Sequence, residues 1–308
     1  MEMDEKMRKN ALVNLAIVVG AGAFGSFCRW LQNQIAFDES GLSVSSPLNV
    51  IVILILLGMV IWVYFLTQKV AEANMKVPED YHDAFFPEER ISVSSAWVIG
   101  IIEVLGGLIL AMTGLDNASP ALTLIFALCA ILSGILVPVC MRSAQTDVSN
   151  GTIALLTTVP ILQFCIGLIN CYKINATNPS VWVYSVQILA YACLAIAFYY
   201  IAGYAYGRVF HYRTLYFSML GAFLSIMVIA DDLNLGLVLI FLANGALLLL
   251  YMYMLMGSME EQEEDPEKKE NALKSRLLTQ LQGRMRSKNV NEDEKVEEIL
   301  HDYHEENK

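Results

Sequence analysis

The sequence contains eight long apolar segments, and this repetition constrains the fold more than any other feature. The hydrocarbon core of a bilayer is about 30 Å thick, so a helix needs roughly 20 apolar residues to cross it. Lipid offers no partners to backbone polar groups, which a helix satisfies internally. The sequence therefore predicts an all-α, polytopic membrane helix bundle. The expected spans are residues 12–34, 47–67, 95–114, 120–141, 152–173, 181–203, 214–231 and 235–256.

The chain has 20 basic and 31 acidic residues, and 24 of these charged residues lie after Gly257. We therefore divide the chain into a transmembrane helix bundle, residues 1–257, and a charged, partly helical cytoplasmic tail, residues 258–308. The chain is 56% apolar, whereas soluble domains are typically about 45–50% apolar. This distribution excludes a soluble enzyme, a nucleic-acid-binding protein and a disordered scaffold.

The positions of lysine and arginine predict that both termini are cytoplasmic. Cytoplasmic loops of membrane proteins carry an excess of these residues. With the N-terminus inside, the outer side of the bundle receives only Arg29 and Lys173. An even number of spans then places the tail in the cytoplasm too. The basic residues assigned to the inner side of the bundle are Lys6, Arg8, Lys9, Lys69, Lys76, Arg90, Arg142, Arg208 and Arg213.

Glu103 lies near the middle of the third predicted span. Insertion scales assign about 2.5–3.5 kcal/mol to an ionised residue such as aspartate at the centre of a helix. Gly100, Gly106 and Gly107 share its helical face, so we expect that face to point toward a neighbouring helix or a cavity. Two interpretations stay open. Glu103 is a proton, cation or substrate site, or it is a protonated or paired residue that joins two helices.

Arg29 lies in the outer third of the first predicted span. A structural ion pair, or extension of the long side chain to the membrane surface, is favoured over a ligand-binding role. Acidic residues at the outer ends of the spans offer the simplest pairing. The candidate partners are Asp38, Asp116, Asp231, Asp232 and, further inward, Glu103.

Thr157 and Thr158 lie beside Pro160 in the fifth predicted span, and Gln163 and Asn244 are further polar residues within spans. Proline interrupts helical hydrogen bonding, so the two threonines would suit an opened backbone in a transporter. Hydrogen bonds between helices explain them equally well. The candidate substrate or ion site comprises Glu103, Arg29, Thr157, Thr158 and Asn244.

The segment Gly20–Gly25 matches the G-x-G-x-x-G pattern of dinucleotide-binding proteins. That function requires a strand before the motif and a helix after it within a βαβ unit. Here the motif lies inside a long apolar span. Small residues at this spacing let membrane helices approach closely, so we expect the glycines to serve helix packing.

The sequence offers no recognisable cofactor or metal site. The four histidines, His82, His211, His301 and His304, fall in predicted cytoplasmic segments, whereas a haem in the bilayer needs axial ligands at membrane depth. The six cysteines form no C-x-x-C motif and are typical of packing residues. No zinc-protease helix or nucleophile elbow occurs. We predict no cofactor and find no catalytic motif.

Two cytoplasmic segments are candidates for contact with other molecules. The loop over residues 68–93 is long enough to dock a protein partner or to cover a cytoplasmic entrance. In the tail, residues 272–286 place leucines on one helical face and basic residues around it. Such a helix lies on anionic lipid or pairs with another helix. We expect contacts with the lipid bilayer and a protein partner, and none with nucleic acid.

The segments Arg29–Gln32, Ala36–Asp38 and Ser40–Leu42 resemble a group of uncharacterised multi-spanning proteins from anaerobic Gram-positive bacteria. The resemblance implies a bacterial plasma membrane and supplies no activity. From the residues, the leading hypothesis is a small-solute or ion transporter with an interior site near Glu103. The alternative is a structural or regulatory subunit of a membrane protein complex.

Overall fold

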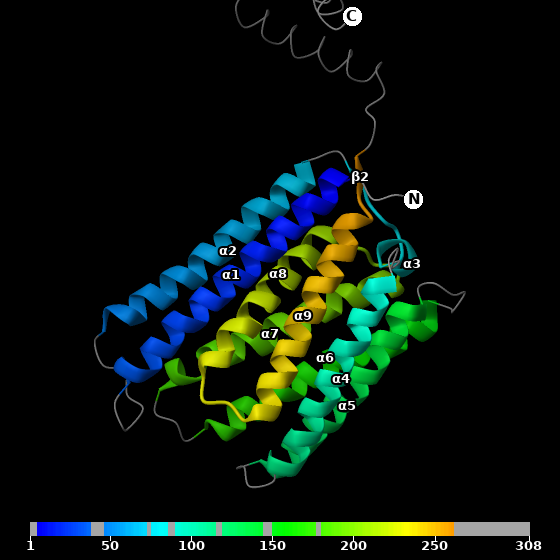
Figure 1. The fold of residues 1–308 in the computed structure, drawn as a ribbon. Coiled ribbons are helices and arrows are strands. Elements are labelled where there is room, and N and C mark those ends of the chain that lie inside the picture. The colour runs from blue at the N-terminus through cyan, green and yellow to red at the C-terminus, as the bar shows by residue number, and fades with distance from the viewer. Residues whose placement is uncertain are drawn as a thin grey trace, which may run out of the picture. The chain divides into compact units, whose positions relative to one another are not determined.

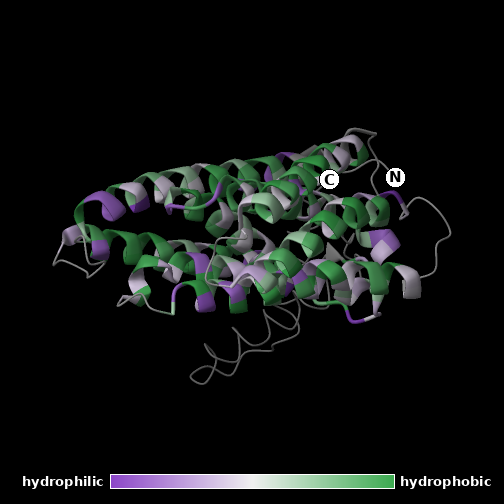
Figure 2. Cartoon of the chain, turned by 90° about the horizontal axis from the view of Figure 1, so that it is seen from below, coloured by the Kyte–Doolittle hydropathy of each residue, from purple (hydrophilic) through white to green (hydrophobic). Residues whose placement is uncertain are grey.

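The structure is a computed structural model, and it describes residues 5–37, 46–72, 75–85, 90–114, 119–143, 150–176 and 180–261. Within these residues, eight helices are long and apolar enough to cross a membrane. Figure 2 shows hydrophobic residues along the helices and strongly hydrophilic ones mainly near helix ends and connections. The chain is therefore an all-helical, multi-pass integral membrane protein, which confirms the predicted fold class.

Several helices are longer than the spans predicted from the sequence. The first helix begins before the predicted boundary at residue 12, and the second continues beyond residue 67. The elements in chain order are α1 (Glu5–Ile35), α2 (Pro47–Glu72), β1 (Met75–Lys76), α3 (Tyr81–Ala84), α4 (Arg90–Thr113), α5 (Pro120–Ser143), α6 (Asn150–Ile174), η2 (Val181–Val183), α7 (Ser185–Ala205), α8 (His211–Met227), η3 (Val228–Ala230), α9 (Leu235–Gly257) and β2 (Glu260–Glu261).

Successive spanning helices run in opposite directions, so α1 begins and α9 ends at the same end of the bundle (Figure 1). We call that end the terminal face and the opposite end the far face. The α1 and α2 helices lie together against α8, while α4 and α5 pair on the other side. The α9 helix contacts both α8 and α4 and thereby joins the two groups.

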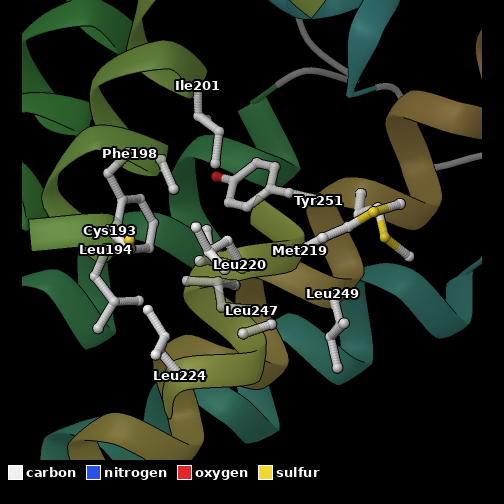
Figure 3. Packing of buried hydrophobic residues seen from close by; sticks show 14 of the residues in the cluster. Cys193, Leu194, Phe198, Ile201, Met219, Leu220, Leu224, Leu247, Leu249 and Tyr251 are labelled. Atoms are coloured by element: carbon white, nitrogen blue, oxygen red, sulfur yellow. The ribbon is translucent and has the colours of Figure 1, made fainter. Parts of the chain in front are cut away.

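The most buried part of the bundle lies where α7, α8 and α9 meet. Figure 3 shows Leu194 and Phe198 of α7 packed with Leu220 of α8 and Leu247 of α9. The α2 helix is the least buried span, with Leu54 exposed along its apolar surface. Since a bilayer solvates apolar side chains, this surface is expected to face lipid.

Glycines bring α4 into close contact with its two neighbours. A Cβ at Gly100 of α4 would collide with the Gly134 carbonyl of α5 and lie 2.7 Å from Pro138 Cγ. On the side of α9, a Cβ at Gly106 would lie 2.9 Å from the Gly236 carbonyl. The glycine face predicted around Glu103 thus packs against neighbouring helices, because only a residue without Cβ permits this separation.

Two further expectations concern the first span and the segments that the sequence predicts to be cytoplasmic. Gly22 and Gly25 of the G-x-G-x-x-G segment pack against α8, as expected of packing residues.

The 68–93 loop is partly structured. The α2 helix runs to Glu72, β1 pairs with β2, and α3 follows. The predicted tail helix over residues 272–286 lies outside the described residues.

Substituting Gly100 by alanine should destabilise the bundle. The added methyl group would meet the Gly134 carbonyl and Pro138, and overpacking costs about 1–3 kcal/mol. Thermal unfolding in detergent should show a clearly lower midpoint for Gly100→Ala. The control is Gly20→Ala, because a Cβ at Gly20 meets nothing within 4 Å and alanine favours a helix over glycine. Equal midpoints for the two variants would contradict the close contact.

Candidate functional site

Four helices each place a polar side chain near their midpoints, and these side chains form one buried cluster. They are Glu103 of α4, Ser133 of α5, Gln163 of α6 and Asn244 of α9. We call them the Glu103 cluster. Glu103 is 1% exposed and the other three are 0% exposed. The cluster therefore lies at the depth of the bilayer centre and away from lipid.

Hydrogen bonds fix one oxygen of the Glu103 carboxyl. Asn244 Nδ2 donates to Glu103 Oε1 at 2.8 Å, and Gln163 Nε2 donates to the same oxygen at 3.0 Å. Asn244 Nδ2 also donates to the Ile240 carbonyl at 2.9 Å. The two bonds from one nitrogen orient the Asn244 amide, because its oxygen must then point away from both acceptors.

Other oxygen atoms of the cluster have no hydrogen-bond partner. They are Glu103 Oε2, Ser133 Oγ, Gln163 Oε1 and Asn244 Oδ1. Ser133 nevertheless lies close enough to interact with the Glu103 carboxyl. No lysine, arginine or histidine within the described residues bonds to this carboxyl. Each unsatisfied buried polar group costs about 1–3 kcal/mol, so the cluster is incomplete as a purely structural network.

Aromatic side chains close the bundle on the terminal side of the Glu103 cluster. Tyr81 and Phe85, at the two ends of the short α3, are fully buried against α7 and α9. The Phe85 ring lies 5.0 Å from Tyr204 and 4.9 Å from Tyr251, and the Tyr81 and Tyr251 hydroxyls are 3.0 Å apart. Burial, with a contribution from Tyr251, raises the pKa of the Tyr81 hydroxyl well above its ordinary value. We call these residues the terminal plug.

The terminal plug lies above the Glu103 cluster along α9. Tyr251 follows Asn244 by seven residues, which corresponds to two helical turns, or about 10 Å, on the same face. The loop predicted to dock a partner or cover an entrance therefore contributes residues that pack onto the bundle itself.

A second aromatic group lies on the far side of the cluster. The Tyr191 ring is 4.9 Å from Phe241 and 5.8 Å from Phe126. Gly167, one turn after Gln163, faces the rings of Tyr191 and Phe126, and a Cβ there would lie 2.6 and 2.8 Å from them. The Glu103 cluster is thus enclosed between two aromatic layers.

The structure places Arg29 away from Glu103, in a network at the far face. Arg29 is 1% exposed, and its Nε donates to Asp231 Oδ1 at 2.8 Å. Its Nη1 donates to Gln32 Oε1 at 2.7 Å, and Nη2 donates to the Trp182 and Val183 carbonyls at 3.1 and 2.6 Å. Arg29 therefore joins α1 to the chain segments before α7 and after α8.

Thr157 and Thr158 also lie outside the cluster. Thr157 Oγ1 donates within its own helix, at 2.9 Å from the Ile153 carbonyl. Thr158 Oγ1 lies 2.9 Å from the Ala154 carbonyl and 3.1 Å from the Tyr206 hydroxyl. Of the predicted site residues, the structure brings together Glu103 and Asn244. The bonds of Thr157 and Thr158 to carbonyls of the preceding turn satisfy both hydroxyls without an opened backbone.

Sequence reasoning left Ser133 and Gln163 out of the candidate site. Gln163 was recognisable as a polar residue in a span, and its position relative to Pro160 gave no sign of its direction. The signal that could have identified Ser133 and Gln163 is their depth within the predicted spans. Both residues lie near the middle of predicted spans, as Glu103 and Asn244 do.

No protein-family model, curated protein or solved structure matched the chain. Within the described residues, no group of three histidine, cysteine, aspartate or glutamate side chains is arranged to hold a metal ion. The oxygens of the Glu103 cluster come instead from one carboxyl, two amides and a hydroxyl.

Replacing Arg29 by methionine should strongly destabilise the fold. Removing one partner of a buried ion pair leaves the other charge uncompensated, at a cost of about 3–5 kcal/mol. Denaturant unfolding in mixed micelles should show this loss for Arg29→Met and a smaller loss for the double variant with Asp231→Asn. The control is Lys173→Met, because Lys173 is an exposed cation of the same face. A loss for Arg29→Met no larger than for the control would refute the structural role.

Proposed function

We propose that this protein transports a small solute or ion across the membrane through the Glu103 cluster. The observation that supports this function is the combination of a carboxyl at the bilayer centre with unpartnered polar atoms around it. Ionisable residues inside membranes are costly and typically mark substrate or ion pathways. A purely structural contact would be expected to give the carboxyl a cationic partner, as Arg29 does for Asp231 at the far face.

The two aromatic layers support an occluded arrangement of this pathway. Glu103 is 1% exposed, with the terminal plug on one side and Phe126, Tyr191 and Phe241 on the other. Transport through the cluster requires the helices to separate at one face at a time. Pro138 of α5 and Pro160 of α6 lie within the helices that line the cluster. Proline lacks a backbone donor, so helices bend most readily at these points.

The sidedness of the protein follows from its basic residues. Lys69, Arg142 and Arg208 lie near the terminal face, whereas Lys173 lies at the far face. The positive-inside rule then favours a cytoplasmic terminal face. The resemblance to multi-spanning bacterial proteins favours a plasma membrane. The terminal plug would accordingly close the cytoplasmic side of the pathway.

The alternative function is a structural or regulatory subunit of a membrane protein complex. The tail would provide the partner contact in that case. The 68–93 loop supports it less, because Tyr81 and Phe85 are buried in the bundle of this chain. A subunit requires no flux through the Glu103 cluster, and this difference separates the two functions.

Replacing Glu103 by glutamine should abolish transport and preserve the fold. Glutamine keeps an oxygen that accepts from Gln163 and Asn244, and it removes the charge. Proteoliposomes with the wild-type protein should take up at least one probe from a panel of radioactive sodium, rubidium, amino acids and sugars. Uptake by Glu103→Gln should fall to the level of protein-free vesicles, with an unchanged thermal midpoint when alkali ions are absent.

The matched control is Thr157→Val. Thr157 is also a buried polar residue of α6, but its hydroxyl bonds within its own helix, so uptake should be retained. Equal uptake by wild-type and Glu103→Gln proteins, or none above protein-free vesicles for any probe, would contradict transport through Glu103. Copurification of a stoichiometric partner in mild detergent, lost on deletion of residues 258–308, would then support the subunit function.

A further inference from the structure

We infer that the Glu103 cluster is a binding site for a small monovalent metal cation of the sodium type. This inference rests on the proposed function, because it names the ion that the interior site would hold during transport. The cluster combines one carboxyl with two amide oxygens and a hydroxyl, at 0–1% exposure of every contributing residue.

The oxygens of the cluster lie close together. Asn244 and Gln163 both donate to Glu103 Oε1, at 2.8 and 3.0 Å. Because the nitrogen and oxygen of an amide are only about 2.2 Å apart, both amide oxygens lie within roughly 5 Å of Oε1. Ser133 lies beside the same carboxyl. Four helices, α4, α5, α6 and α9, thus place polar side chains with unpartnered oxygens around one carboxyl.

The charge of the site indicates a single positive charge as its complement. Glu103 has no cationic partner among the described residues. An uncompensated carboxylate is unfavourable at the bilayer centre, and a bound monovalent cation makes the cluster neutral. A divalent cation would leave a net positive charge, and such ions are usually held by several carboxylates and retained waters.

The number of unpartnered atoms favours a metal cation over a proton. A proton on Glu103 Oε2 would create one donor and satisfy one acceptor in addition to Oε2. Of the unpartnered atoms Oε2, Ser133 Oγ, Gln163 Oε1 and Asn244 Oδ1, two would then remain without a partner unless the Ser133 hydroxyl turned to donate to an amide oxygen. Oxygen-seeking cations bind several carboxylate, amide and hydroxyl oxygens together. A cation therefore satisfies several of these oxygens without that reorientation.

Binding can be measured on the full-length protein without any transport assay. Purified protein in choline chloride is titrated with sodium, lithium or potassium chloride at constant ionic strength, and the thermal midpoint is recorded. A ligand that binds only the folded state stabilises it by RT ln(1 + [L]/Kd). We expect one of these alkali ions to raise the midpoint by about 5 °C relative to choline at a concentration well above its Kd. Equal midpoints in all four salts would overturn the inference.

Three variants localise the effect. Glu103→Gln should remove the alkali-ion shift, and Ser133→Ala should raise the Kd fitted to the titration about tenfold, as expected for one lost ligand oxygen. The matched control is Ser225→Ala, because Ser225 is equally buried and its Oγ already bonds the Gly221 carbonyl at 2.7 Å. A shift that survives Glu103→Gln unchanged, or that Ser225→Ala weakens as much as Ser133→Ala, would place the cation elsewhere and overturn the inference.

The two proposals fail separately. Glu103-dependent flux driven by a pH gradient, without an alkali-ion shift, would overturn the cation site and retain the transporter. A Glu103-dependent shift in a protein that moves no probe would retain the cation site and give it a structural role.

Discussion

The structure depends on the close approach of α4 to α5 and α9. A bilayer offers no water to polar groups, so a carboxyl at its centre must be enclosed by protein. Gly100 and Gly134 on one side, and Gly106 and Gly236 on the other, remove the Cβ atoms that would hold the helices apart. This packing makes Glu103 1% exposed. It also places the side chains of α5, α6 and α9 around the carboxyl.

Two buried charges in this bundle have different surroundings. Arg29 at the far face donates to Asp231, Gln32 and two backbone carbonyls, so most of its donors are used. Glu103 receives two amide donors on one oxygen and none on the other. The first arrangement is a structural anchor between helix ends. The second leaves a buried carboxyl at mid-helix without a cationic partner among the described residues, and this contrast is the basis of the functional proposal.

Much of the fold could be predicted from the sequence, because apolar length and helical periodicity are local properties. The spans and the burial of Glu103 were recognisable, and Asp231 was one of five candidate partners of Arg29. Ser133 and Gln163 were not assigned to the site, since their direction depends on how α5 and α6 pack. The docking of α3 was also unrecognisable, because four residues in a polar loop show no periodicity.

The central claim is that the Glu103 carboxyl belongs to an exchangeable cation site. Infrared difference spectroscopy of the membrane-embedded protein measures the ionisation of that carboxyl directly, as choline is replaced by sodium, lithium or potassium at fixed pH. The account predicts loss of a protonated-carboxyl band and gain of carboxylate bands for one alkali ion, with neither change in Glu103→Gln. An alkali-insensitive Glu103 band, or the same difference spectrum in Glu103→Gln, would contradict it.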